Sequence, residues 1–145
     1  PFVRAMQTTF EILAELPLEP GPIQEADHVE YSDLSATIGL VGPERASLLL
    51  AADRQTAVDL TRRISGRDAE FQASLVADTL GEILNIIAGA AQRESALKFD
   101  FSLPVVVRGS QHEIIPFETF YGRKSVSTLP GGGVTLLLLR QAEST

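Results

Sequence analysis

Residues 70–95 contain no proline and repeat apolar residues at intervals of three and four, the spacing of an amphipathic helix. This is the longest segment of the chain with a helical period. We therefore expect the longest helix of the protein here, with one side buried against the other elements.

The two sides of this expected helix differ in chemistry. At about 100° per residue, an arc of roughly 60° holds Asp78, Glu82, Asn85 and Gly89. We call these four residues the polar stripe. The other side of the helix is apolar and consists of Val76, Leu80, Ile83, Leu84, Ile87 and Ala91.

Two further helices and at least five strands are expected. A helical pattern over 2–16 ends at Pro17, and a second helix follows Asp53, which can cap it, and stops at Gly66. Between them, β-compatible runs at 35–41 and 46–52 flank a turn at 42–45, which predicts a hairpin. After the long helix, strand patterns cover 99–108, 113–121 and 134–140, and the glycine-rich segment 130–133 is expected to be a turn.

The order of these elements favours an α+β fold. Short turns between successive strands indicate an antiparallel sheet rather than a parallel nucleotide-binding one. We expect a two-layer α/β sandwich, in which long helices cover a mainly antiparallel sheet, in a single domain over residues 1–145. Phe10-Glu-Ile-Leu-Ala14 lines up with Gly81-Glu-Ile-Leu-Asn85, and a helix precedes strands in both places, so an internal pseudo-repeat is also expected.

Composition and motifs argue against several functions. The net charge of -7, with no basic cluster, makes nucleic acid a poor partner. The longest aliphatic run, 134–139, is far shorter than the roughly 20 residues of a membrane helix, so no membrane partner is expected. The chain has no cysteine, and it lacks the motifs of serine hydrolases, zinc proteases and dinucleotide enzymes. His28 and His112 lack the neighbours of a metal site, so we expect them at the surface or at strand ends.

The polar stripe is the remaining candidate site. A carboxylate at Glu82 and a carboxamide at Asn85 project side by side, and Gly89 would leave bare backbone for the close approach of another protein. An ordinary solvated helix face has the same pattern, and the spacing alone leaves both interpretations open.

A longer motif favours a functional site. Asp78-Thr-Leu-Gly-Glu-Ile-Leu-Asn-Ile-Ile-Ala-Gly89 resembles the active-site helix of the CheC/CheX/FliY chemotaxis phosphatases, whose pattern is Asp-x-x-Gly-Glu-x-x-Asn-x-x-x-Gly. Residues 1–5, 38–42 and 103–109 also resemble segments of the CheX branch. Ala46 and Ala90 depart from residues common in the family, which indicates a divergent branch.

The resemblance implies a phosphatase that acts on the aspartyl phosphate of a CheY-like response regulator. Asn85 would hold a water in line with the phosphorus, and Glu82 would pair with the lysine of the regulator's active site. Asp78 and Gly89 would be partner-contact residues. The phosphatase would need no cofactor of its own, because the regulator supplies Mg²⁺. Since Ala14 stands where a second asparagine would be, one site per chain is expected.

The resemblance also implies a cytoplasmic homodimer. Aliphatic strands such as 134–139 would need cover if they formed an open sheet edge, but would need none if they were central. The alternative function is a non-catalytic module that binds a receiver or scaffolds a flagellar switch.

Overall fold

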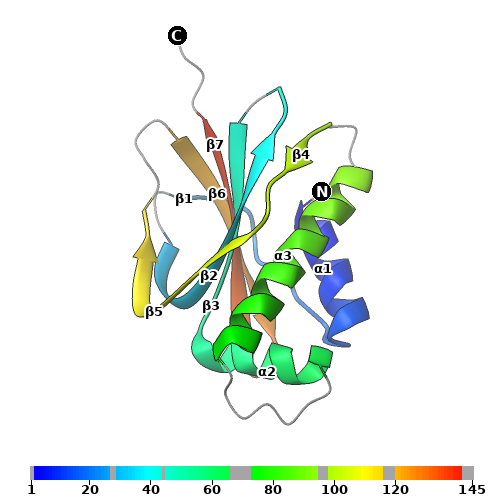
Figure 1. Cartoon of the computed structure of the whole chain (residues 1–145), viewed down its shortest axis with the longest axis vertical. Helices are drawn as coiled ribbons and strands as arrows, with labels where there is room; N and C mark the ends of the chain where they lie inside the picture. The colour runs from blue at the N-terminus through cyan, green and yellow to red at the C-terminus, as the bar shows by residue number, and fades with distance from the viewer. Residues whose placement is uncertain are drawn as a thin grey trace.

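The computed structural model describes residues 2–26, 29–43, 45–65, 73–94, 98–115 and 120–141. These residues form three helices and seven strands (Figure 1). In chain order the elements are α1 (Phe2–Leu13), β1 (Gln24–Ala26), β2 (Val29–Val41), β3 (Arg45–Ala52), α2 (Arg54–Ser65), α3 (Ala73–Glu94), β4 (Asp100–Phe101), β5 (Val105–Ile114), β6 (Phe120–Leu129) and β7 (Gly132–Gln141).

The strands make one antiparallel sheet. Its order is β1-β6-β7-β3-β2-β4, and β5 pairs with β2 on the side away from β3. The expected hairpin of β2 and β3 is confirmed, with a register that runs from Leu34 opposite Ala52 to Val41 opposite Arg45. The expected α+β class with a mainly antiparallel sheet is therefore confirmed.

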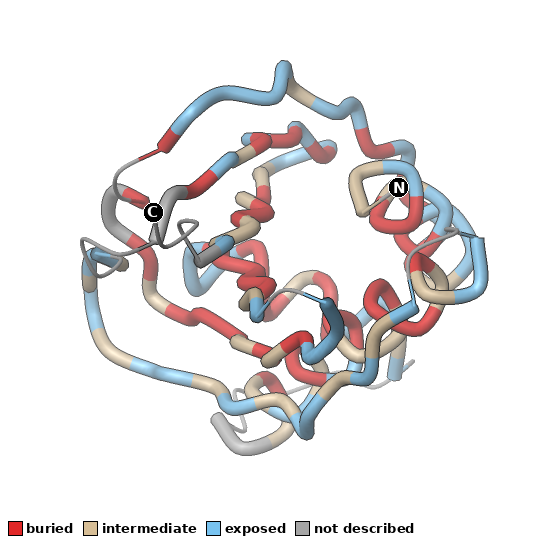
Figure 2. The backbone as a smooth tube through the Cα atoms, turned by 90° about the horizontal axis from the view of Figure 1, so that it is seen from above, coloured by how far each residue is buried: buried red, intermediate tan, exposed pale blue. Residues whose placement is uncertain are grey.

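The helices cover one face of the sheet. Figure 1 shows α1 and α3 next to each other on the right of the strands, with α2 crossing the lower end. Figure 2 shows buried residues on the central strands and on the helix surfaces that face them. The largest fully buried side chains include Met6 and Phe10 of α1, Leu48 and Leu50 of β3, and Leu84 of α3. A smaller cluster around Val29, Leu49 and Leu137 lies on the other face of the sheet.

Helix ends differ from the expectation at one place. The helix expected over 2–16 ends at Leu13, because Glu15 adopts a positive φ of 52° and turns the chain back. The N–H of Leu16 then reaches the carbonyl of Phe10 at 3.3 Å. The cap of α2 is confirmed, since Asp53 Oδ1 accepts the N–H of Thr56 at 2.8 Å. Gly66, expected to stop this helix, lies outside the described residues.

The prediction of one continuous strand over 99–108 is wrong, because the structure has two strands there, β4 and β5. Ser102, Leu103 and Pro104 interrupt the pairing, and a proline has no N–H to donate to a sheet. The pattern at 113–121 is divided as well, because Ile114 ends β5 and Phe120 begins β6. Residues 116–119 of that expected strand lie outside the described part.

β7 is central, which removes one argument for a dimer. It pairs with β3 on one side and with β6 on the other, so its aliphatic residues are covered within the chain. Of the two positions that the sequence left open for this strand, an open edge or the centre of the sheet, the structure shows the central one.

The strand order bears on the expected pseudo-repeat. The strands lie in the order β1-β6-β7-β3-β2-β5. Exchanging β1, β2 and β3 with β5, β6 and β7, respectively, gives β5-β2-β3-β7-β6-β1, which is the same order read from the other edge. A duplicated unit of one helix and three strands would give this order. The duplication itself stays a prediction.

Candidate functional site

The apolar side of α3 is buried as the sequence predicted. Val76, Leu80, Ile83, Leu84, Ile87 and Ala91 are each at most 2% exposed. They pack against α1, α2 and the sheet, which fixes the rotation of the helix about its axis. The polar stripe must then face away from the core.

Three members of the polar stripe are accessible. Asp78 and Glu82 are exposed, and Asn85 is half-buried. The side chain of Asn85 makes no hydrogen bond to any other residue in the described part of the chain. Glu82 and Asn85 therefore offer a carboxylate and an unengaged carboxamide one helical turn apart.

Gly89 differs from the expectation of bare, open backbone. It is buried, and a Cβ atom there would lie 3.4 Å from Nη1 of Arg93 and 3.8 Å from the ring of Phe101. The Arg93 side chain folds back along the helix over the glycine, as residues at i and i+4 do. A partner would therefore meet the guanidinium of Arg93 at this position.

Arg93 is exposed on the same side of α3 and is not among the four residues that the sequence predicted for the polar stripe. It lies one turn beyond Gly89, so continuing the same helical projection would have included it. The stripe thus carries two acidic groups, Asp78 and Glu82, towards its N-terminal end and a cation towards its C-terminal end. A complementary partner would place a basic group near Glu82 and an acidic group near Arg93.

Gly81, directly before Glu82, belongs to the motif, but the sequence predicted no contact for it. It is buried, and a Cβ there would lie 3.4 Å from Cγ2 of Val106 and 3.5 Å from Cγ of Pro104. A Cβ at these distances would make ordinary van der Waals contact, so the segment that holds Pro104 and Val106 packs against α3 at this glycine. The segment between β4 and β5 therefore lies against α3 at the neighbour of Glu82, and Figure 1 shows this segment running alongside α3.

A second cluster of polar residues has a structural role. Nδ1 of His112 donates to the Gly109 carbonyl at 2.8 Å, which leaves Nε2 to accept from Oγ of Ser35 at 2.6 Å. Ser35 is only 2% exposed, so it is a poor nucleophile for an external substrate. His112 is half-buried near the end of β5, and His28 lies outside the described residues.

Asp33 extends this cluster and fixes α2. Its Oδ1 accepts the N–H of Gln111 at 3.0 Å, and its Oδ2 accepts the N–H of Arg54 at 2.9 Å. These hydrogen bonds, led by that of Gln111, lower the pKa of Asp33. The carboxylate thus joins β2 to β5 and to the first residue of α2.

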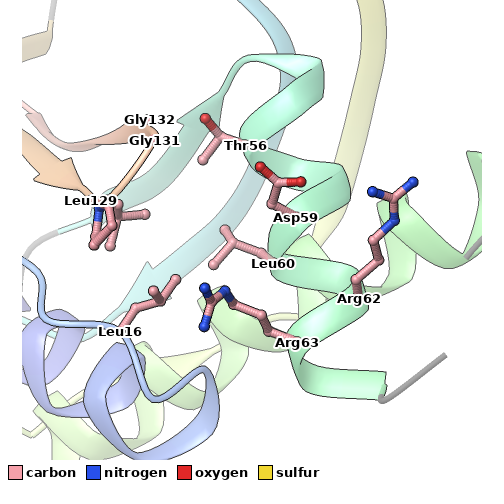
Figure 3. A pocket seen from close by; sticks show the side chains of 10 residues that line it. Leu16, Thr56, Asp59, Leu60, Arg62, Arg63, Leu129, Gly131 and Gly132 are labelled. Carbon is pink, nitrogen blue, oxygen red and sulfur yellow. The ribbon is translucent and has the colours of Figure 1, made fainter. Parts of the chain in front are cut away.

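A pocket of about 440 Å³ lies between α2 and the β6–β7 turn, away from the polar stripe (Figure 3). The guanidinium of Arg63 points towards Leu16 and Leu129, and Asp59 and Thr56 lie higher on α2. Oγ1 of Thr56 is buried beside Gly132 and has no hydrogen-bond partner among the described residues. No residue of α3 lines this pocket, so it does not contribute to the candidate site.

Among the described helices, none is long and apolar enough to cross a membrane. The described residues contain no group of three or more His, Cys, Asp or Glu side chains arranged to hold a metal ion.

Comparison with known proteins identifies the fold as that of CheX-type chemotaxis proteins. CheX from Vibrio vulnificus matches with 27% identity over 97% of both chains and a TM-score of 0.87. CheX from Desulfovibrio desulfuricans matches with 23% identity over 97% of both chains and a TM-score of 0.88. A complex of CheX, CheY, BeF3 and Mg²⁺ from Borrelia burgdorferi matches with 22% identity, covering 99% of this chain and 96% of that one, and a TM-score of 0.81.

The sequence profile of the chemotaxis phosphatase CheX matches residues 34–119, more than half of the chain, including Glu82 and Asn85. The chain therefore belongs to the CheX chemotaxis phosphatase family, and the resemblance drawn from the sequence is confirmed. A search of curated protein sequences finds no significant match.

Proposed function

We propose that the chain binds a phosphorylated CheY-like response regulator and promotes hydrolysis of its aspartyl phosphate. The observation that carries the proposal is the open pair of Glu82 and Asn85 on α3, in a chain of a phosphatase family. The Borrelia burgdorferi complex of CheX with CheY, which has the same fold, supports a CheY-like partner.

In the proposed reaction, a water oxygen attacks phosphorus while the bond from phosphorus to the aspartyl oxygen breaks. The products are inorganic phosphate and the free aspartate of the regulator. The carboxamide of Asn85 orients the attacking water, and it is available because it has no partner in the described part of the chain. Mg²⁺ comes from the regulator, where it neutralises charge on the phosphoryl oxygens.

Glu82 sets the register of the complex. Its carboxylate is exposed one turn before Asn85, where it can pair with a lysine of the regulator. Asp78, exposed one turn earlier, adds a contact, and at Gly89 the contact is made through Arg93.

One such site per chain is proposed. Glu11 of α1 occupies the position in the expected first repeat that Glu82 occupies in the second, but Ala14 replaces the asparagine. The proposal also includes a homodimer with both polar stripes open, and a cytoplasmic location beside the phosphorylated regulator.

The direct test follows the decay of the aspartyl phosphate on purified CheY-type receivers, with and without the chain. Faster decay with the wild type and basal decay with Asn85→Ala would support the proposal. Unchanged decay on every receiver that binds would instead support the non-catalytic binding module.

A further inference from the structure

The segment between β4 and β5 presents a leucine beside the polar stripe. Leu103 is 86% exposed, the highest value among the large hydrophobic residues described. A single exposed leucine is common on protein surfaces and means little by itself. Leu103 differs from other exposed leucines in where it lies and in how its two chain neighbours are held.

Two anchors hold Leu103 in place. On one side, Ser102 donates its N–H to the Gly39 carbonyl at 3.0 Å, and its Oγ accepts the Gly39 N–H at 2.9 Å. On the other side, Pro104 packs at Gly81 of α3 and has a fixed φ. The leucine between them is therefore presented to solvent on restrained backbone, so little conformational entropy is lost when it is covered.

The anchors also place Leu103 close to the polar stripe. A Cβ at Gly81 would lie 3.5 Å from Cγ of Pro104, and these residues are the chain neighbours of Glu82 and Leu103. With about 3.8 Å between successive Cα atoms, the Cα atoms of Glu82 and Leu103 are at most about 15 Å apart. A typical interface covers about 800 Å² per partner, a disc of roughly 16 Å radius.

We propose that Leu103 is an apolar anchor for the regulator, inserted into an apolar surface beside the phosphorylated aspartate. This inference rests on the proposed function and deepens it. Asn85 orients the attacking water, whereas Leu103 increases the affinity for the regulator and determines which regulator is bound. A receiver with a polar surface at that place would leave the leucine unpaired and would bind more weakly.

The experiment compares Leu103→Ala with Ile115→Ala. Ile115 is a matched control because it is 72% exposed and follows the far end of β5. Each variant is assayed with a CheY-type receiver phosphorylated by acetyl phosphate, over a range of receiver concentrations, and each is melted.

Leu103→Ala is expected to raise KM about tenfold, the loss typical of a buried apolar anchor, with kcat unchanged at saturation. Ile115→Ala should leave both constants unchanged, and both variants should melt like the wild type. An unchanged KM for Leu103→Ala, or an equal rise for Ile115→Ala, would overturn the inference while leaving the phosphatase proposal in place.

Two other outcomes are also decisive. If the wild type neither binds the phosphorylated receivers nor speeds their decay, both proposals fail. If Leu103→Ala lowers the mass in light scattering without changing KM, the leucine belongs to a contact between two copies of the chain, and its proposed role in regulator binding is wrong.

Discussion

Replacement of Asn85 by alanine should separate catalysis from stability. The carboxamide is half-buried and makes no hydrogen bond to the described residues, so its removal breaks no hydrogen bond among them. The helix around it is held by the buried apolar side of α3, which the substitution does not touch.

The expected effects on activity and stability have opposite signs. Alanine favours a helix interior over asparagine by about 0.5 kcal/mol, so the free energy of unfolding should be unchanged or slightly higher. For a domain of this size that is a rise in Tm of about 2 °C. Loss of the group that orients the water should lower the rate of phosphate release by about 100-fold or more.

The assay measures aspartyl-phosphate decay, receiver binding and thermal unfolding on the same preparation. Glu94→Ala, at an exposed position outside the polar stripe of the same helix, is the control and should keep full activity. A fall in Tm of several degrees for Asn85→Ala would show that Asn85 is structural. Wild-type turnover in that variant would refute its role in catalysis.

Three further predictions concern other parts of the chain. Glu82→Lys should weaken regulator binding by several kcal/mol in titrations, because two like charges would meet, whereas Glu11→Lys on α1 should not. Light scattering should give twice the chain mass of 15.6 kDa, and a value near 15.6 kDa would contradict the dimer. The lowered pKa of Asp33 means that its ionised form stabilises the fold above pH 3.8, its ordinary value, and that this contribution is lost as pH falls through the folded-state pKa. The difference in unfolding free energy between wild type and Asp33→Ala should therefore shrink below pH 3.8, and a constant difference would exclude this role.

The sequence predicted what depends on local periodicity. The buried side of α3 was predicted residue by residue because a helix repeats every 3.6 residues and its core contacts repeat with it. The β2–β3 hairpin followed from a short turn between two β-compatible runs.

Features that join distant segments could not be predicted in this way. Gly89 is covered partly by Phe101 of β4, and Gly81 by Pro104, and a projection of one helix contains neither neighbour. The central place of β7 could not be predicted either, because an aliphatic run is typical of any buried strand, whatever its position in the sheet. The roles of Asp78, Glu82, Asn85 and Gly89 stay predictions until the assays are done.

The central place of β7 also limits how far the protein can fold during its synthesis on the ribosome. Ala46 of β3 pairs with Arg140 of β7. The backbone hydrogen bonds along this edge of β3 can therefore form only after almost the whole chain has been synthesised. Such non-local pairing slows folding, and nascent chains ending before β7 would carry two unpaired edges, on β3 and β6. These intermediates are prone to aggregation, so we expect expression of shortened forms that lack β7 to give insoluble protein.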